Sequence, residues 1–337
     1  MKADIVVGGF YGDEGKGRIV GHLAVADNYY CVVRAGGGPQ AGHTVTRGKK
    51  VTQIPSGFIN PLSKLLIGRG TAINPDIVLS EIKQFGVKSR IGIDYGCTII
   101  EPEHLEQEKE LVERIGSVGT GTGPARVERI LRTAKLAKDI ESLKPFLTDV
   151  ASEINECLKL GKKVLIEGVQ AYGLSLLNHK FYPYVTSQDT TASQFVADVG
   201  IGPKAIGEIF VVYKAYVSRV GKGNMFSEWT EEQGKQRGIS EKGTVSGRTR
   251  RLGDFDMKLA SESILGNTGT QVAITCIDRL FEGNSGVRDF AKLTPEAKDF
   301  IKKISTHLKG SSPYFKEITL ISTGPDLEDT IDLRQSL

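Results

Sequence analysis

The chain has 337 residues, of which 39% are hydrophobic and 25% are charged, and its formal net charge is +4. This composition favours a folded chain over a disordered one, and so small a positive excess gives no support to nucleic-acid binding. No apolar run approaches the ~18 residues of a membrane span, and no signal peptide is evident. The forty glycines are the unusual number, because glycine suits sharp turns and close approaches to a ligand.

The cysteines are widely spaced and form no CxxC pair, so neither a metal cluster nor a disulfide framework is predicted. They are Cys31, Cys97, Cys157 and Cys276. Reduced thiols of this kind are typical of a cytoplasmic protein, which is the location that we predict.

Short apolar runs alternate with glycine-bearing turns and helical patterns along the chain. The predicted strands are Ala3–Val7, Tyr30–Arg34, Leu65–Ile67, Lys163–Ile166, Ile206–Val217, Val272–Ile277 and Ile318–Ser322. The predicted helices are Lys16–Ala26, Asp76–Phe85, Glu103–Ile115, Pro145–Lys159 and one opened by Thr294. This alternation predicts an α/β fold with a mostly parallel central sheet and helices on both faces, in which ligands bind beyond the carboxyl ends of the strands. We expect one domain over residues 1–337, with small peripheral subdomains.

A glycine-rich loop, Gly8–Gly17, joins the first strand to the first helix. Its backbone amides, the helix N-terminus and Lys16 together favour phosphate binding. It is a variant of the Walker A loop, since Phe10 stands where the first Gly belongs and Gly17 replaces the hydroxyl that holds Mg²⁺. A tight turn without a ligand is the alternative. Asp13 disfavours it, because a carboxylate among phosphate-facing amides is costly unless it binds a metal or moves a proton.

Further polar side chains follow other predicted strands. His43 lies beyond the second strand and, with Asp13, would put a proton donor and acceptor in one cleft, although a lone His is more often a core or surface residue. Gly116–Pro124 is a second glycine loop with hydroxyl side chains, or else a flexible connector. The arginine-bearing loop Gly243–Arg251 suits a dicarboxylate, with a nucleic-acid or surface charge cluster as the alternative.

The segment Gly12–Gly17, preceded by an aromatic residue, resembles the N-terminal signature of the adenylosuccinate synthetase family. Matching motifs follow in order over nearly the whole chain, at Ala41–Thr44, Ile54–Gly57, Gly121–Ala125, Glu167–Gln170, Tyr182–Thr186, Gly247–Arg251 and Ser322–Asp326. The family makes adenylosuccinate from inosine monophosphate (IMP), L-aspartate and GTP with Mg²⁺. The short length is similar to that of compact archaeal forms.

The resemblance implies a role for each matching residue. Asp13 and His43 would be catalytic, and Asp13 with the carbonyl of Gly42 would hold Mg²⁺. The GTP-binding residues would be Gly12, Glu14, Gly15, Lys16, Gly17, Gly42, Thr44, Asp278, Ser322 and Gly324. The IMP-binding residues would be Asp13, Gln40, Ser117, Val118, Arg132, Gln170, Thr186 and Arg248. The aspartate-binding residues would be Thr244, Ser246, Arg248 and Arg250.

Two of these residues carry further expectations. Arg132 would share a helix face with Arg129 and reach the IMP site of a partner subunit, which implies a homodimer. Asp278, placed at the end of a buried strand, would accept hydrogen bonds from the guanine edge. The sequence departs from the family at Cys276, where a Lys is usual, and at Val118, Pro39 and Thr249.

Two other functions stay open at this point. A sister enzyme adds aspartate to a guanine nucleotide and forms a 2-amino-adenylosuccinate, but it typically lacks the acid found here at Asp13. A GTP-binding switch without ligase chemistry would account for Gly8–Gly17 and Asp278. It would leave His43 and the two arginines Arg248 and Arg250 without a role.

Overall fold

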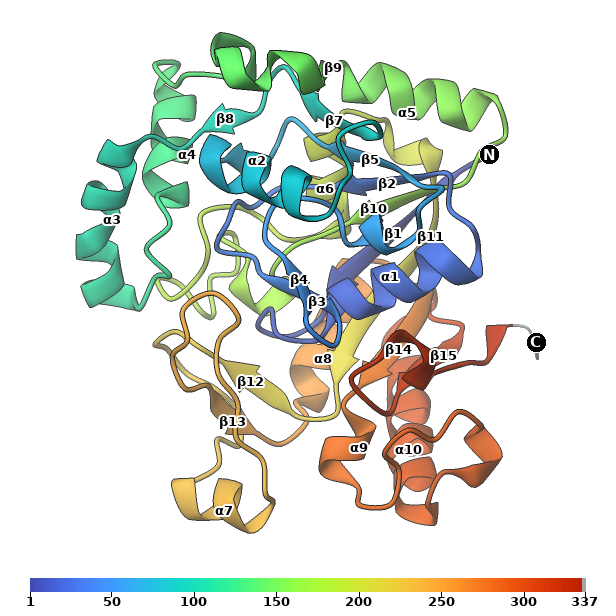
Figure 1. Ribbon diagram of the computed structural model, residues 1–337. Helices are drawn as coiled ribbons and strands as arrows, with labels where there is room; N and C mark the ends of the chain where they lie inside the picture. Colours follow the sequence, from blue (N-terminus) through green and yellow to red (C-terminus); the bar gives the residue numbers. More distant parts are fainter. Residues whose placement is uncertain (335–337) are drawn as a thin grey trace.

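One ten-stranded sheet organises the computed structural model, which describes residues 1–334 (Figure 1). The strand order is β16-β15-β14-β11-β1-β10-β2-β5-β7-β9. The strands are β1 (Ala3–Gly8), β2 (Cys31–Arg34), β5 (Lys64–Ile67), β7 (Ile91–Asp94), β9 (Leu147–Thr148), β10 (Val164–Glu167), β11 (Ile206–Lys214), β14 (Gln271–Thr275), β15 (Glu317–Ser322) and β16 (Thr330–Asp332). Within the described residues, β16 pairs antiparallel with β15, and the other neighbours in this sheet are parallel. The mostly parallel sheet is therefore confirmed.

Helices cover both faces of the sheet. Since successive residues of a strand point to opposite sides, each strand contributes side chains to both layers. In β1, Val6 packs with α1 (Lys16–Ala26) and α2 (Pro75–Gln84), whereas Ile5 and Val7 belong to the core on the other face. That second core holds the apolar sides of α5 (Val150–Lys159), α6 (Ala192–Val199), α8 (Met257–Gly266) and α10 (Pro295–Ser311). The strands are apolar on both faces, as a covered parallel sheet requires.

Smaller units surround the sheet and supply the loops of the site. They are the hairpins β3 (His43–Thr46) with β4 (Lys49–Val51) and β12 (Val217–Arg219) with β13 (Arg251–Gly253), the pair β6 (Ala72–Ile73) with β8 (Thr98–Ile99), and the helices α3 (Pro102–Ile115), α4 (Thr122–Leu131), α7 (Glu231–Gln236) and α9 (Ile277–Leu280). Figure 1 shows α3 and α4 on the left and α7 below β12 and β13. Within residues 1–334, no helix has the length and apolar character needed to cross a bilayer.

Two predicted boundaries were wrong for local reasons. The helix predicted over Pro145–Lys159 begins only at Val150, because the side chain of Asp149 caps it by accepting a hydrogen bond from the Ser152 amide, and a 3₁₀ turn and β9 come before it. The strand Ile206–Val217 ends at Lys214, and Val217 opens β12 instead.

Two predicted site residues also lie in different backbone contexts. The strand β14 stops at Thr275 because Cys276 is left-handed, with φ 61°, so Asp278 lies in α9 and not at a strand end. Arg132 has φ 64° and caps the C-terminus of α4, so it does not share a helix face with Arg129. A left-handed residue turns the chain away from the helix axis.

We predict that Gly9→Ala destabilises the protein, because an added Cβ would overlap the ring of Tyr213. That ring is buried and fixed by hydrogen bonds of its hydroxyl with Ala260 and Ser263, so it cannot move aside cheaply. Overpacking of this kind lowers the free energy of unfolding by about 1–3 kcal/mol, measurable by urea denaturation. Gly202→Ala is the control, since open space surrounds that position. Equal stability of the two variants would contradict the close packing.

Candidate active site

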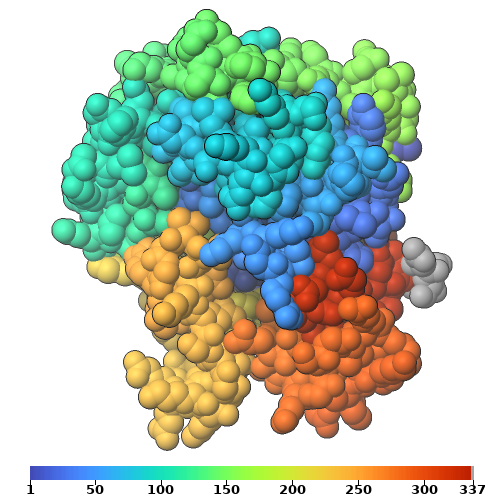
Figure 2. Space-filling model, in the orientation of Figure 1, coloured from blue at the N-terminus to red at the C-terminus, as the bar shows by residue number. Residues whose placement is uncertain are grey.

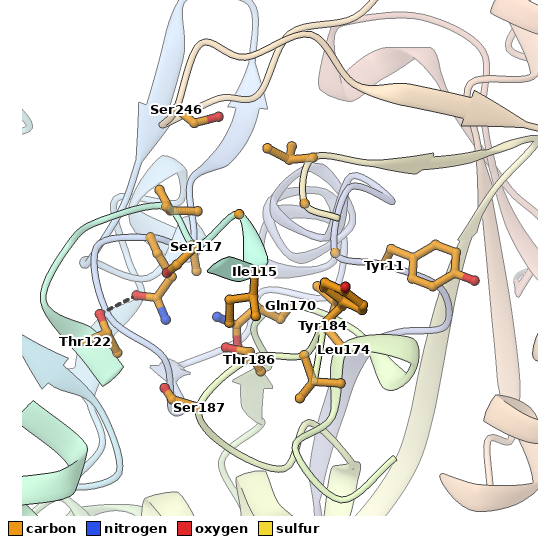
Figure 3. Close-up of a pocket in the computed structure, with 18 of the residues that line it drawn as sticks. Tyr11, Ile115, Ser117, Thr122, Gln170, Leu174, Tyr184, Thr186, Ser187 and Ser246 are labelled. Carbon is orange, nitrogen blue, oxygen red and sulfur yellow. Dashed lines mark hydrogen bonds between the residues drawn. The ribbon is translucent and has the colours of Figure 1, made fainter. Parts of the chain in front are cut away.

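A cavity of about 340 Å³ opens at the carboxyl edge of the sheet. Gly12 and Asp13 enter it after β1, Gln40–His43 after β2, and Gln170 after β10. Residues within 115–123, 182–187 and 243–246 also line it, as do side chains of α3 and residues 219–222 (Figure 3). The expectation that ligands bind beyond the strand ends therefore agrees with the position of this cavity.

The phosphate loop is closed by its own glutamate. The Glu14 carboxylate accepts hydrogen bonds from the amides of Phe10 and Gly12, at 3.1 and 2.8 Å, and Lys16 Nζ lies 2.9 Å from it. Gly15, with φ 83°, caps α1, and α1 begins with Lys16 and Gly17. The carboxylate that faces the amides is thus Glu14, whereas the sequence analysis placed Asp13 there. The loop has the geometry of an anion site, and an internal anion satisfies it.

Asp13 points towards the arginine-bearing loop. Arg250 Nη2 lies 2.7 Å from Asp13 Oδ1, and Arg250 Nη1 lies 3.0 Å from Glu241 Oε2. Lys214, at the end of β11, also pairs with Glu241. Burial raises the pKa of Asp13 to about 6 although Arg250 and Lys214 oppose the rise. A carboxyl group near that value can hold or release a proton close to neutral pH.

His43 is held by buried charged groups. Its Nδ1 lies 2.6 Å from Arg34 Nη1 and also contacts Glu167 Oε1. Glu167, at the end of β10, accepts further hydrogen bonds from Arg34 at 2.9 Å and from the amide and hydroxyl of Ser56 at 2.6 Å each. Burial and the Arg34 charge lower the pKa of His43, and the pKa of Glu167 is low despite its burial because His43 and Arg34 favour the carboxylate. These contacts engage Nδ1 and leave Nε2 as the nitrogen available to a ligand.

The residues expected to bind the guanine of GTP follow neighbouring strands. Asp278 comes after β14, and Ser322 and Gly324 come at the end of β15 and after it. Arg18 of α1 donates to the Ser322 hydroxyl at 2.8 Å and to the carbonyls of Gly324 and Pro325. Ser322 is fully buried under these contacts, so it is not open to solvent. These residues, and the exposed Thr44, lie outside the cavity lined by Asp13 and His43.

Most of the residues expected to bind IMP line the cavity, namely Gln40, Ser117, Val118, Gln170 and Thr186, together with Asp13. Figure 3 shows Gln170 and Thr186 close to Tyr184 and Leu174 within it. The Oε1 atom of Gln170 is buried and has no hydrogen-bond partner within the described residues, which leaves it free for a donor on a ligand. Arg132 is exposed and outside the cavity.

The arginine-bearing loop contacts the segment at Gly42 and the second glycine loop. Thr244 and Ser246 line the cavity, and an added Cβ on Gly42 would lie 2.8 Å from Val245 and 2.9 Å from Thr244. Arg248 lies beside a neighbouring cavity and donates to the carbonyls of Gly116 and Ser117, at 2.9 Å each. Figure 2 shows this light-orange loop against the green α3 region and beside the blue β3–β4 hairpin.

Sequence reasoning gave no role to five residues that support the site, namely Arg34, Thr122, Glu167, Lys214 and Glu241. Three of them, Arg34, Glu167 and Lys214, are charged residues that end otherwise apolar buried strands. A charged side chain is buried in a protein only when a partner compensates its charge. A charged residue at the end of an apolar strand could therefore have been recognised in the sequence as a member of the site. Thr122 and Glu241 lie in loops and at a helix start, where polar residues carry no such signal.

A parallel sheet with a phosphate-loop variant and an acid–histidine pair at its carboxyl edge defines a nucleotide-dependent α/β enzyme. The family model described as adenylosuccinate synthetase matches residues 5–142 and 132–285 of the chain. The chain belongs to the adenylosuccinate synthetase family.

Curated adenylosuccinate synthetases are similar to this chain along its whole length. The adenylosuccinate synthetase of Archaeoglobus fulgidus is 48% identical over 341 residues, which cover 99% of each chain. That of Thermococcus sibiricus is 46% identical over 346 residues, which cover 100% of each chain. The expected similarity to short archaeal forms is thus confirmed.

Two solved structures share the fold. A fully ligated adenylosuccinate synthetase from Plasmodium falciparum superposes with a TM-score of 0.87 at 23% identity, covering 98% of this chain and 100% of the other. Cyanophage S-2L succinoaminodeoxyadenylate synthetase, bound to dGMP and dATP, superposes with a TM-score of 0.81 at 22% identity, covering 98% and 95%. At these identities the likeness supports the fold alone.

We predict that Glu167→Gln lowers the free energy of unfolding by about 3–5 kcal/mol, because it leaves the buried charge of Arg34 without its partner. Glu228→Gln is the matched control. It removes an ion pair with Arg251 whose side chains are 37% and 33% exposed, and such a pair contributes about 1 kcal/mol or less. Chemical denaturation of both variants gives the comparison. A loss no larger for Glu167→Gln than for Glu228→Gln would contradict the anchoring role of Glu167.

Proposed function

We propose that this protein ligates IMP and L-aspartate to adenylosuccinate with hydrolysis of GTP to GDP and phosphate. The observation that carries the proposal is the convergence of Asp13, His43, Gln170 and the loop bearing Thr244 on one cavity at the carboxyl edge of the sheet. A base, a phosphate-side histidine, a purine-binding amide and a carboxylate-binding loop are the parts that this reaction needs. The family membership of the whole chain supports the same reaction.

Asp13 takes the proton from N1 of IMP in the first step. The 6-oxygen then attacks the γ-phosphorus of GTP, a new O–P bond forms, and the bond from that phosphorus to the GDP oxygen breaks. A pKa near 6 suits a group that accepts this proton near neutral pH. His43 donates a hydrogen bond from Nε2 to the transferring phosphoryl group, because Nδ1 accepts from Arg34 and the single proton of the neutral ring is then on Nε2.

The second step joins aspartate. Its amine attacks C6 of the 6-phosphoryl intermediate, a C–N bond forms, and phosphate leaves with the electrons of the C–O bond and takes the proton that the amine loses. Arg248 and Arg250 bind the substrate carboxylates, and Thr244 and Ser246 add hydroxyl contacts at the cavity wall. Arg250 then exchanges its present partners, Asp13 and Glu241, for a substrate carboxylate.

The donor atoms available near the phosphate loop fit Mg²⁺. Within residues 1–334 no three His, Cys, Asp or Glu side chains converge as a ready metal site. Mg²⁺ is commonly held by one or two protein oxygens and by substrate phosphates, so a shared site suits it. Asp13, whose Oδ1 contacts Arg250, and the Gly42 carbonyl would supply the protein oxygens. The ion would neutralise charge on the phosphates.

GTP occupies the phosphate loop through Gly12, Glu14, Gly15, Lys16 and Gly17, with Gly42 and Thr44 beside it. Asp278 accepts hydrogen bonds from the guanine edge, and Ser322 and Gly324 contact the base. Arg18 already joins α1 to the Ser322–Pro325 turn, which supports one continuous site from phosphate to base. The contacts around Ser322 have to open for the base to reach it.

We also propose a homodimer in which Arg132 reaches the IMP site of the partner. The outer face of α4 supports this proposal, because Val127, Ile130 and Leu131 are 55%, 72% and 64% exposed. Apolar side chains gathered next to an exposed arginine are typical of an interface.

The chain acts as one domain, and the free cysteines agree with a protein that works in the cytoplasm.

A reaction assay tests the ligase proposal. Phosphate release should require GTP, Mg²⁺, IMP and aspartate together, with adenylosuccinate identified by mass spectrometry. Release without IMP or aspartate would favour a GTP switch. Product formed from dGMP and not from IMP would favour the 2-amino-adenylosuccinate reaction.

Asp13→Asn tests the assigned base. We expect kcat to fall by about a hundredfold or more, since a general base contributes about 10²–10⁴ in rate. GTP affinity, measured by calorimetry, should change little, because the amides of the phosphate loop remain. Asp254→Asn is the control, as that carboxylate accepts from Trp229 outside the cavity. Normal turnover of Asp13→Asn would remove Asp13 from the mechanism.

Ile130→Glu tests the dimer. A charge on the 72%-exposed apolar side chain should yield monomers in sedimentation and reduce kcat, because Arg132 no longer reaches a partner. Leu62→Glu, at a 73%-exposed residue in another part of the surface, should stay dimeric and active. A fully active, dimeric Ile130→Glu variant would exclude this face of α4 as the interface.

A further inference from the structure

We infer that Thr122 is a positioning residue of the IMP site, because it turns the side-chain amide of Gln40 so that its N–H group faces the anionic phosphate of the nucleotide. The inference rests on the proposed function and on the assignment of Gln40 to IMP binding, which comes from the family resemblance. Thr122 is 2% exposed and opens α4, Gln40 follows β2, and both residues line the cavity.

The hydrogen bond between these two residues sets the orientation of the amide. Thr122 Oγ1 donates to Gln40 Oε1 at 2.7 Å, which Figure 3 marks as a dashed line. A glutamine side chain presents an acceptor at Oε1 and two donors at Nε2. With Oε1 engaged by a donor, Nε2 is left for a ligand, and an anionic phosphate needs donors.

A second hydroxyl favours Thr122 as the donor. Thr120 Oγ1 lies 3.2 Å from Thr122 Oγ1. When Thr120 donates to Thr122, the hydrogen of Thr122 is directed to Gln40, so the three side chains form a chain of donors with one direction. The backbone of Gly38 lies close to this hydrogen bond, since a Cβ on Gly38 would lie 2.6 Å from Thr122 Oγ1 and 2.9 Å from Gln40 Oε1.

The loop before Gln40 is fixed to α4 at another point. Arg126 of α4 donates to the carbonyl of Gly70 at 2.9 Å and also to Gln188 Oε1. The same oxygen of Gln188 accepts from the amide of Gly37 at 3.1 Å. The backbone at Gly37 is therefore held by Gln188, which Arg126 binds in turn. Thr122 restricts the rotation of the side-chain amide of Gln40.

Thr122→Val, which removes the hydroxyl and keeps the shape, is the main test. We expect the dissociation constant for IMP to rise about tenfold, since a hydrogen bond to a charged group is lost or misdirected. Binding of inosine, which has no phosphate, and the KM for GTP should change by less than about threefold. Thr122→Ser should restore IMP affinity. Thr122→Ala also removes the hydroxyl and replaces the valine variant if that variant does not fold.

A double-mutant cycle with Gln40→Ala completes the experiment. If Thr122 acts through Gln40, adding Thr122→Val to Gln40→Ala should weaken IMP binding no further. Additive losses, an equal loss of inosine binding, or unchanged IMP binding in Thr122→Val beside weak binding in Gln40→Ala would overturn the inference alone. Unchanged IMP binding in Gln40→Ala would overturn the assignment of Gln40 to IMP and this inference with it.

Discussion

The carboxylate of Glu167 is the contact on which the site depends. It ends a buried central strand, accepts hydrogen bonds from Arg34 on the neighbouring strand and from Ser56, and contacts the ring of His43 in the following hairpin. A charge with no exposure to water is tolerated only when such partners surround it. The same bonds that compensate Glu167 therefore fix the ring of His43 relative to the sheet, and the phosphate-side geometry follows from the core.

The rest of the site balances its charges internally. Glu14 satisfies the loop amides, Arg250 pairs with Asp13, Arg248 binds backbone carbonyls, and Arg18 binds the Ser322 turn. Under the proposed function, each substrate anion therefore replaces an internal partner and does not enter an unoccupied positive field. Such an exchange makes the net gain from each ionic contact smaller than the contact itself, and it ties the movement of one loop to the binding of another ligand.

The sequence predicted the architecture well because two strong patterns carry it. Apolar runs that end in glycine turns predicted most strands of the sheet, and the phosphate loop marked its first strand–helix junction. Errors arose where one residue overrides a pattern, as the cap at Asp149 and the left-handed Cys276 do. Gln40, Gln170 and Thr186 were assigned from the family motif and lie in the cavity. Thr122 was noted only as one hydroxyl of the second glycine loop, and its contact with Gln40 was not predicted because it joins segments 82 residues apart.

Close backbone packing explains why glycine is concentrated at the strand ends. A Cβ on Gly17 would lie 2.7 Å from the Cβ of His43, and one on Gly42 would lie 2.8 Å from Val245. The start of α1 therefore packs against the β3 hairpin, and the hairpin against the arginine-bearing loop, at positions where only glycine leaves room for the neighbouring side chains. Under the proposed function, the amides of the phosphate loop, His43 and the arginine-bearing loop have to hold reacting groups next to each other, which this close packing allows. Alanine at either glycine would push these three elements apart while leaving the sheet beneath them intact.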